Sequence, residues 1–465
     1  MNGATWHELL GHPTPAWLQD GKFGIYTHWG IYSVHAFGPN TTWFAHHLYN
    51  GKEGERKLFE ERFGPFGKKG YTDLIPLFTA EKFDPEEWAD LFVQSGARFA
   101  GPVAEHHDGF AMWQTSLTPF NSFDMGPRRD VVAQLEKAYR ARGLKYLLAL
   151  HHAENYWYMN RMPGTDGEKP ENEMMFSKAG LWPFERFCKL WYDKTVELID
   201  KFSPDMLWFD FGLKSIPDVY KRNMLAHYYA RAGADKREAG ICYKFHDLVT
   251  GGGIIDLELG RFNDMMYHPW ITDSTVDDGQ AWGYMEGAAY KTAEELVHYL
   301  VDNVSKNGYL LLNVGPRADG TIPQEAQEAL KGIGKWLAVN GEAIYGTTPW
   351  YTYGTGPTKM KESGMFSESE KMKYTPEDIR LTAKDDAIYA TVLARPAGEA
   401  VISEVAPHLL PGEMESIRLL GHGRPLEYTV KDGKILVSFP QDAAESPAYC
   451  FKIARNTGVF NPPGL

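Results

Sequence analysis

DMLWFDFGL, residues 205–213, is the stretch around which the rest of the chain is organised. A short apolar run that follows a proline-containing turn is typical of a buried parallel strand. Asp210 stands where this strand should end. A buried carboxylate costs several kcal/mol unless it has a partner, solvent or a chemical role. Because catalytic side chains collect at the C-terminal ends of barrel strands, Asp210 is the first candidate for a catalytic group.

Strand-like and helix-like segments alternate on both sides of this stretch. Such alternation predicts a parallel α/β sheet, and the number of repeats favours closure into a TIM-like (β/α) barrel. Residues 35–80 and the segment with HPWITD and AWGY are expected to be loops. Strands are expected within residues 23–34, 97–110, 145–152, 205–213, 240–245, 253–259 and 308–316, and helices at about 84–94, 130–142, 184–202, 219–233, 293–305 and 324–339.

The pattern changes after Trp350. Residues 351–380 are rich in turn formers, and short segments with period-two alternation follow, such as DAIYATVLAR and KILVSF. Alternation of this kind between Gly, Pro and Asp turns is typical of half-buried antiparallel strands. We therefore expect a barrel domain at residues 1–350 and a small C-terminal β-sandwich domain at residues 351–465.

Bulk composition excludes several classes of protein. A formal net charge of −13 argues against a nucleic-acid partner. Three widely spaced cysteines argue against a disulfide framework or a thiolate zinc site. The N-terminus resembles no signal peptide, and no run approaches the ~18 apolar residues of a membrane helix. We expect a protein without a membrane partner that is cytoplasmic, or exported with its signal removed.

Histidines follow three of the expected strands: His28, the pair His106 and His107, and the pair His151 and His152. They permit a metal-dependent hydrolase. Adjacent histidines on a strand point to opposite faces, however, so each pair is a poor chelate. Imidazole both donates and accepts hydrogen bonds. The high aromatic content of 14% suits sugar rings, although on composition alone a large core is the simpler explanation. We expect no metal.

A glycosidic bond is hydrolysed by two carboxyl groups in opposed environments, one ionised and one protonated. The candidates for the partner of Asp210 are Asp256, Glu258, Asp273 and Glu286. Asp256 and Glu258 share one face of an expected strand, so a purely structural pairing is an alternative. Glu258 lies nearer the strand end and beside a glycine that lets substrate approach. It is therefore the first choice.

Five segments of the chain resemble the α-L-fucosidases of glycoside hydrolase family 29. The resemblance implies a (β/α) barrel, often imperfect, with a C-terminal β-sandwich. It also implies a retaining double displacement that uses no metal or organic cofactor. The segments, in order, are FGIYTHWGIYSV, EHHDGF, LWFDFG, LLLNVGPRADGTIP and GKWLAVNGEAIYGT.

The same resemblance implies roles for individual residues. Asp210 holds the place of the family nucleophile, and Trp208 matches a tryptophan that borders the sugar. His28, His106 and His107 match histidines that hold the fucose hydroxyls. The family commonly has lysine before HHDGF, whereas this chain has glutamate there.

Three further residues fall near family positions. Trp43 stands where the family has an aromatic after a glutamate, but Thr42 precedes it here. Lys244 falls near a family arginine close to the acid/base, where it offers a point charge and not a planar fork. Trp282 falls near the methyl group of fucose, for which an indole face is a good apolar wall.

The function expected from the sequence is an exo-acting, retaining α-L-fucosidase that acts on fucosylated glycans. Asp210 would attack the anomeric carbon and Glu258 would be the acid/base, with their carboxyl groups about 5–5.5 Å apart. Two rivals remain: a catalytically silent sugar-binding protein on the same scaffold, and a metal-dependent barrel hydrolase. Association into a homo-oligomer is open.

Overall fold

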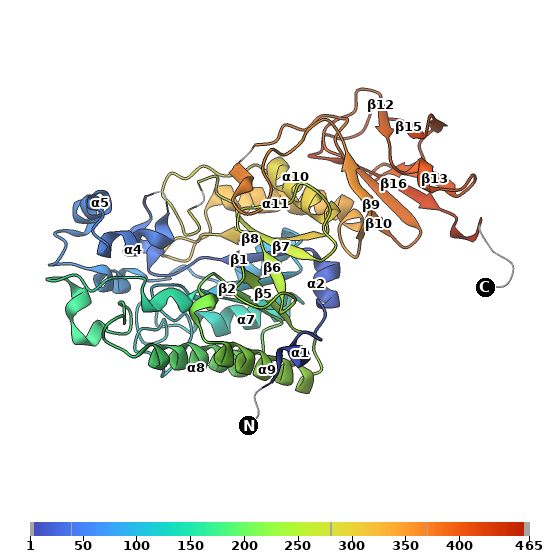
Figure 1. Cartoon of the computed structure of the whole chain (residues 1–465). Helices are drawn as coiled ribbons and strands as arrows, with labels where there is room; N and C mark the ends of the chain where they lie inside the picture. The colour runs from blue at the N-terminus through green and yellow to red at the C-terminus, as the bar shows by residue number, and fades with distance from the viewer. Residues whose placement is uncertain (1–3, 39, 280, 370, 460–465) are drawn as a thin grey trace.

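In the computed structural model, which describes residues 4–38, 40–279, 281–369 and 371–459, eight parallel strands close into a barrel (Figure 1). The last strand pairs with the first, so that Ile25 lies between Ala100 and Leu312. The TIM-like barrel predicted from the sequence is confirmed. Its strands are β1 (Phe23–Thr27), β2 (Phe99–Glu105), β3 (Lys145–Leu150), β4 (Met206–Phe209), β5 (Gly240–Lys244), β6 (Ile254–Asp256), β7 (Trp270–Thr275) and β8 (Gly308–Val314).

Strand β4 shows how the alternation of side chains places the site. Met206 and Trp208 belong to the apolar cluster that fills the barrel interior. Leu207 and Phe209 belong to the larger cluster between the strands and the surrounding helices. Since successive side chains alternate between the two faces, the side chain of Asp210 points to the barrel interior, as those of Met206 and Trp208 do.

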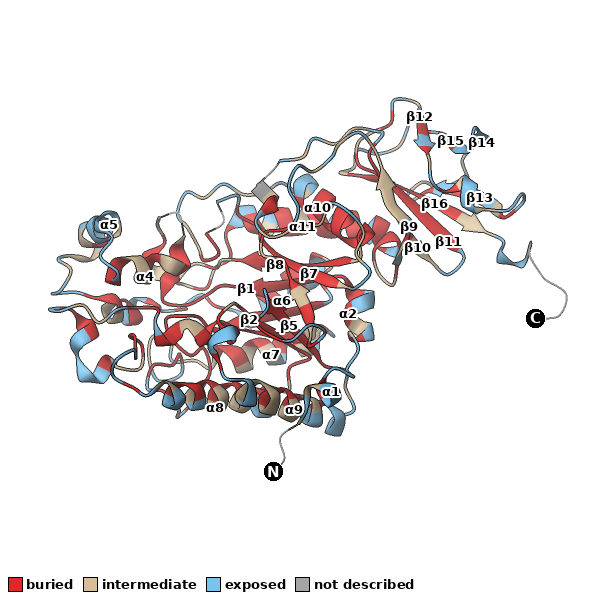
Figure 2. Ribbon diagram, viewed as in Figure 1, coloured by how far each residue is buried: buried red, intermediate tan, exposed pale blue. Residues whose placement is uncertain are grey.

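Most outer helices bury one face against the barrel and expose the other, whereas α10, which also contacts the C-terminal sheet, is buried on all sides from Leu296 to Ser305 (Figure 2). Helix α6 begins as its sequence predicts, because the Asp84 side chain accepts the N–H groups of Glu86 and Glu87 and Pro85 occupies the first turn. No α-helix of the described residues separates β5 from β6 or β6 from β7, so the barrel is imperfect. The helices are α6 (Pro85–Gln94), α7 (Val131–Ala141), α8 (Phe184–Phe202), α9 (Asp218–Ala234), α10 (Ala293–Ser305) and α11 (Gln324–Asn340).

A strand, β7, and two helices, α4 (Phe44–Tyr49) and α5, lie where the sequence predicts loops. Strand β7 begins in the HPWITD segment, and its sequence signal is weak because only Trp270 and Ile271 are apolar. The polar residues after them are buried and form hydrogen bonds. Thr272 Oγ1, for example, donates to the Leu257 carbonyl at 2.7 Å. Helix α5 (Glu53–Phe63) buries only Phe59. Its sequence therefore lacks the apolar stripe by which helices are recognised. The described residues also form the shorter helices α1 (Trp6–Leu9), α2 (Ala16–Gly21), α3 (Tyr32–His35) and α4 (Phe44–Tyr49), of which α4 contacts α5.

The C-terminal part forms two antiparallel sheets that share one apolar cluster, which confirms the predicted β-sandwich. The larger sheet has the order β13-β16-β11-β10-β9 and the smaller β12-β15-β14. The strands are β9 (Thr348–Thr355), β10 (Ile379–Lys384), β11 (Ala387–Val392), β12 (Glu399–Ile402), β13 (Met414–Leu419), β14 (Tyr428–Lys431), β15 (Lys434–Ser438) and β16 (Tyr449–Arg455).

The expected domain division after residue 350 falls inside β9, which pairs with β10. We propose that the two domains meet just before this strand; the expected outer limits at residues 1 and 465 lie outside the described residues. The larger sheet lies beside α10 and α11 (Figure 1). Arg380 Nε of this sheet donates to Asp302 Oδ1 of α10 at 2.6 Å, a buried ion pair that ties the two parts together.

The three cysteines, Cys188, Cys242 and Cys450, are buried and free. Among the described residues, no helix combines the length and the apolar character that crossing a membrane requires.

Candidate active site

A hollow of about 280 Å³ opens at the C-terminal ends of the barrel strands. Larger hollows lie beside α10 and between α11 and the C-terminal sheets, but neither contains Asp210. Eight of the nine site residues predicted from the sequence line this hollow, and the ninth, His107, contacts Asp210 from beside it. The lining residues are Tyr26, His28, Thr42, Trp43, His106, His151, Trp208, Asp210, Phe211, Lys244, Glu258, Asp273 and Trp282.

Asp210 is buried among three basic side chains. Its Oδ2 lies 2.9 Å from His151 Nδ1 and 3.2 Å from His107 Nε2. Its Oδ1 lies 3.2 Å from Lys244 Nζ. Burial alone would raise the pKa of Asp210, but the ammonium of Lys244 and the two imidazoles outweigh burial and hold this pKa well below its usual range. Asp210 is therefore an ionised carboxylate at neutral pH.

Glu258 has the opposite electrostatic character. It follows β6 in a turn and keeps its carboxyl 2.7 Å from Lys244 Nζ. Burial, together with the nearby Asp273 and Asp210 carboxylates, outweighs Lys244 and raises the pKa of Glu258 to about 7. The backbone of the turn is held from far along the chain, because the Phe366 N–H donates to the Glu258 carbonyl at 2.8 Å.

Of the other acids considered from the sequence, Asp273 lines the same hollow, whereas Asp256 and Glu286 do not. Asp256 is fully buried in the barrel and accepts the indole N–H of Trp208; burial and the neighbouring Asp273 raise its pKa well above the usual range. Asp273 accepts the Tyr26 hydroxyl at 2.9 Å and lies 3.3 Å from Lys244 Nζ. Glu286 is on the surface and pairs with an arginine. The expectation that Asp256 and Glu258 share a strand face is wrong, because β6 ends at Asp256.

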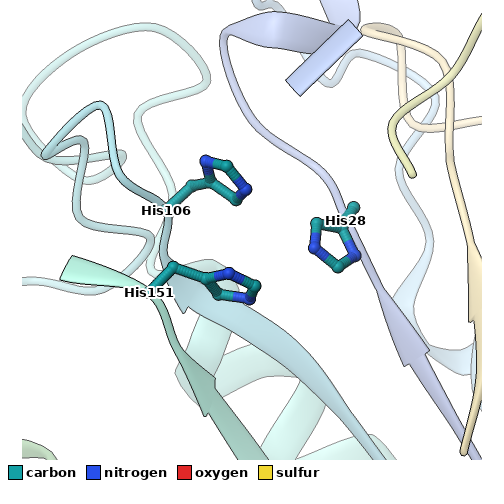
Figure 3. Close-up of side chains that lie close together, drawn as sticks. All are labelled: His28, His106 and His151. Carbon is teal, nitrogen blue, oxygen red and sulfur yellow. The ribbon is translucent and has the colours of Figure 1, made fainter. Parts of the chain in front are cut away.

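Figure 3 shows His28, His106 and His151 converging from three strand ends. His106 and His107 both reach the site because β2 ends at Glu105 and the pair lies in the turn beyond it. The alternation expected of adjacent histidines does hold for the other pair. His151 faces the hollow, whereas His152 points outward, with Nε2 3.4 Å from the Trp191 carbonyl.

Burial is the main reason that the pKa values of His28 and His106 lie well below that of free imidazole, and neighbouring imidazoles lower them further. Both rings are therefore neutral. Asn313 of β8 fixes the ring of His28, since its Oδ1 lies 2.8 Å from His28 Nδ1. Two sets of side chains have the spacing of metal ligands: His28 with His106 and His151, and His107 with His151 and Asp210.

Aromatic side chains form the remaining walls. Lys244 Nζ lies 4.9 Å from the ring centroid of Trp208 and 5.8 Å from that of Trp282. Trp43 stacks on Phe211 with 6.0 Å between centroids. Trp282 has a positive φ of 59°, which its carbonyl helps to hold by accepting from Asn313 Nδ2 at 2.6 Å.

Sequence reasoning missed Tyr26, Asn313 and Phe211, and it gave His151 no individual role. Tyr26 could have been found, because it lies two residues before His28 on the same face of β1. Glu105, which departs from the family pattern, lies outside the hollow and forms a buried ion pair with Lys194 of α8 at 2.7 Å.

Replacing Lys244 by methionine should reduce the free energy of unfolding by about 3–5 kcal/mol at pH 8. The reason is that several buried carboxylates would lose the cation that they share. Their pKa values would rise in the variant, so protonation should relieve much of the loss at pH 5. Chemical denaturation at the two pH values measures this. Lys371→Met, which removes an exposed pair with Asp278, should leave the stability nearly unchanged at both pH values.

An equal loss at pH 5 and pH 8 in Lys244→Met would show that Lys244 stabilises the fold by packing and not by its charge.

Both parts of the chain match families of known proteins. The family model described as α-L-fucosidase matches residues 2–342, and the model of the α-L-fucosidase C-terminal domain matches residues 371–454. The chain belongs to the α-L-fucosidase family. The plasma α-L-fucosidases of Homo sapiens and Rattus norvegicus are 33% and 34% identical to it; each alignment covers 94% of this chain, and 88% and 90% of the respective relative.

Among solved structures, the α-fucosidase of Thermotoga maritima in complex with fucose superposes with a TM-score of 0.78 and 29% identity, covering 97% of this chain and 99% of that one. The fucosidase fold therefore extends over both domains described above.

Proposed function

We propose that this protein is an exo-acting, retaining α-L-fucosidase that removes terminal α-L-fucosyl residues from glycans. One observation carries the proposal: Lys244 lies between an ionised Asp210 and a Glu258 whose pKa is raised to about 7. Two carboxyl groups with opposed protonation are what glycoside hydrolysis requires. Because both contact the same ammonium, at 3.2 and 2.7 Å, their separation is compatible with the about 5–5.5 Å of retaining enzymes.

In the first step, Asp210 attacks the anomeric carbon and forms a covalent fucosyl-enzyme ester, while Glu258 donates its proton to the departing glycosidic oxygen. In the second step, Glu258 takes a proton from water, and the water oxygen attacks the same carbon and releases the Asp210 carboxylate. Two inversions leave the product with the configuration of the substrate. No group beyond these side chains and water enters either step.

The neutral histidines fit recognition of the sugar. With Nδ1 directed at Asn313, His28 presents Nε2 to the hollow, where it can accept a hydrogen bond from a sugar hydroxyl. We assign the same kind of contact to His106. His107, which the sequence also assigned to a sugar hydroxyl, has Nδ1 2.7 Å from the His151 carbonyl and Nε2 3.2 Å from Asp210, so we assign it to holding the nucleophile. Hydrogen bonds that tighten as the ring becomes an oxocarbenium-like species favour the transition state over the bound substrate.

The tryptophans fit the apolar parts of fucose. We assign Trp282 to the methyl group, and Trp208 and Trp43 to the walls that border the ring. The hollow ends on the buried barrel floor, so a sugar can enter it from one side only, which supports exo action. Association into a homo-oligomer stays open, and the expectation of a cytoplasmic or exported protein stays a prediction.

The test is hydrolysis of 4-nitrophenyl α-L-fucoside followed by NMR of the anomeric proton. Retention predicts that α-L-fucose is formed first and that the β-anomer grows only by mutarotation. First-formed β-L-fucose would overturn the retaining mechanism. The matched 4-nitrophenyl β-L-fucoside should be left intact.

The same assay separates the rival functions. Binding of fucose without hydrolysis would favour the silent sugar-binding protein. Activity that is lost on treatment with EDTA and restored by a divalent metal would favour the metal-dependent hydrolase.

A further inference from the structure

The three histidines in Figure 3 form a cluster whose chemistry the proposed hydrolysis does not exhaust. One ring nitrogen from each of His28, His106 and His151 lies within 4.8 Å of one from each of the others, and all three residues are buried. The rings of His106 and His151 stack with centroids 4.7 Å apart, and the ring of His28, at the end of the neighbouring strand β1, meets both edge to face. Three imidazoles thus converge on one point.

Hydrogen bonds fix two of these rings with the second nitrogen directed inward. Asn313 Nδ2 donates to the carbonyl of Trp282, so Asn313 Oδ1 must be the acceptor that His28 Nδ1 faces at 2.8 Å. The Asp210 carboxylate likewise accepts from His151 Nδ1 at 2.9 Å. In both rings the proton is on Nδ1, and the lone pair is on Nε2.

One nitrogen that faces the cluster is also without a partner. His151 Nε2 is buried and makes no hydrogen bond with any described residue. A buried acceptor without a partner is costly, so it favours a ligand. An imidazole that donates one N–H to a carboxylate or carbonyl oxygen and offers its other nitrogen is the arrangement found in metal-binding histidines.

We propose that His28, His106 and His151 bind a divalent transition-metal ion, with Zn²⁺ as the probe, and that this ion inhibits the enzyme by occupying the sugar pocket. Three imidazoles with a fourth position open to water form a known type of tetrahedral zinc site. Zn–N distances of about 2.0–2.1 Å require the nitrogens to draw together by roughly 1.4 Å at most, which small side-chain rotations supply.

Charge in the pocket is compatible with a cation. The single ammonium of Lys244 lies within 3.3 Å of both Asp210 and Asp273, so the carboxylates outnumber it. Asp210 and Asn313 act as the outer partners of the ligands, in the way that a metal site needs. The ion is an inhibitor and not a cofactor, since the hydrolysis proposed above proceeds through carboxyl groups and water.

The consequence is mutual exclusion of metal and sugar. Two of the three imidazoles that would bind Zn²⁺, those of His28 and His106, are assigned to sugar hydroxyls, so both ligands cannot be bound together. Exclusion rests on the proposed function, whereas metal binding does not.

The first experiment is calorimetric titration of the metal-free, full-length protein with Zn²⁺, without any sugar. One ion per chain is expected for the wild type. Asn313→Ala should weaken binding by roughly 10–100-fold, and His106→Ala by at least as much. His47→Gln removes a surface imidazole that lies 3.5 Å from Glu55 and should leave the affinity unchanged.

Equal affinity in the wild type and His106→Ala would overturn the proposal, as would a loss confined to His47→Gln. His28→Gln serves as a second ligand variant should His106→Ala unfold, which thermal melting would reveal. Co²⁺ gives an independent readout: the visible absorption of a tetrahedral ion is expected in the wild type, and the weak spectrum of an octahedral one contradicts the site.

The second experiment adds L-fucose to the Co²⁺-loaded protein. Loss of the tetrahedral spectrum, together with Zn²⁺ raising KM for the aryl fucoside while kcat stays constant, supports exclusion. A Zn²⁺ effect on kcat alone would overturn it. If the protein binds Zn²⁺ through these histidines but hydrolyses no fucoside, the proposed function fails and the metal site stands. If it hydrolyses the fucoside but binds no Zn²⁺, the metal site fails and the proposed function stands.

Discussion

Replacing Asp210 by glycine should lower kcat/KM toward an aryl α-L-fucoside by on the order of 10⁴–10⁶-fold, the range found when a nucleophile that acts as part of a unit is removed. The reason is chemical and not structural. Asp210 is the ionised carboxylate that Lys244, His107 and His151 hold beside the hollow, and glycine leaves no group to form the ester. Initial rates on 4-nitrophenyl α-L-fucoside measure the loss.

Azide should restore turnover in Asp210→Gly, because it fits the space vacated by the carboxylate and attacks from the same side. A single inversion then gives β-L-fucosyl azide, which NMR identifies. Glu286→Gln removes a surface carboxylate paired with Arg62 and should leave activity near that of the wild type. Formation of the α-azide would mean that Asp210 is not the nucleophile.

Replacing Glu258 by alanine should reduce hydrolysis by roughly 10²–10⁴-fold for substrates with poor leaving groups, the usual contribution of general acid–base catalysis. An activated aryl fucoside, whose leaving group needs no proton, should form the fucosyl-enzyme at a nearly normal rate. Azide should then intercept that intermediate and yield α-L-fucosyl azide after two inversions. Comparison of a reactive with an unreactive fucoside measures both effects.

The pH profile gives an independent check on Glu258. Its carboxyl must be protonated to act as the acid, and its pKa is raised to about 7. kcat/KM of the wild type should therefore fall as the pH rises above about 7, and this limb should be absent in Glu258→Ala. The pKa of Asp210 lies well below its usual range, so this carboxylate stays ionised and activity should persist into acidic solution.

Normal hydrolysis of poor leaving groups by Glu258→Ala would place the acid elsewhere. Asp273 and Asp256 would then be next, although both lie on the buried floor of the barrel. Glu286, another candidate from the sequence, is ruled out by its place on the surface.

Much of the fold could be predicted because its periodicity is local. The limits of α8, Phe184–Phe202, coincide with those expected from the sequence. Strand β7 could not be predicted, because its buried polar residues Thr272 and Asp273 form hydrogen bonds with partners from other parts of the barrel, and such partners leave no trace in the local sequence. Helix α5 was missed for the opposite reason, since it faces solvent and buries almost nothing.

The sequence by itself determined where Asp210 stands. In DMLWFDFGL, side chains alternate between the barrel interior and the helices, so two residues after Trp208 the chain returns to the interior at the strand end. Only the tertiary structure decided what faces Asp210. Lys244, Glu258 and His151 come from three other strand ends, and the turn of Glu258 is held by Phe366, more than a hundred residues later. The face of a strand on which a side chain lies depends only on its position along that strand. The protonation of two carboxyl groups depends instead on charges that only folding brings together.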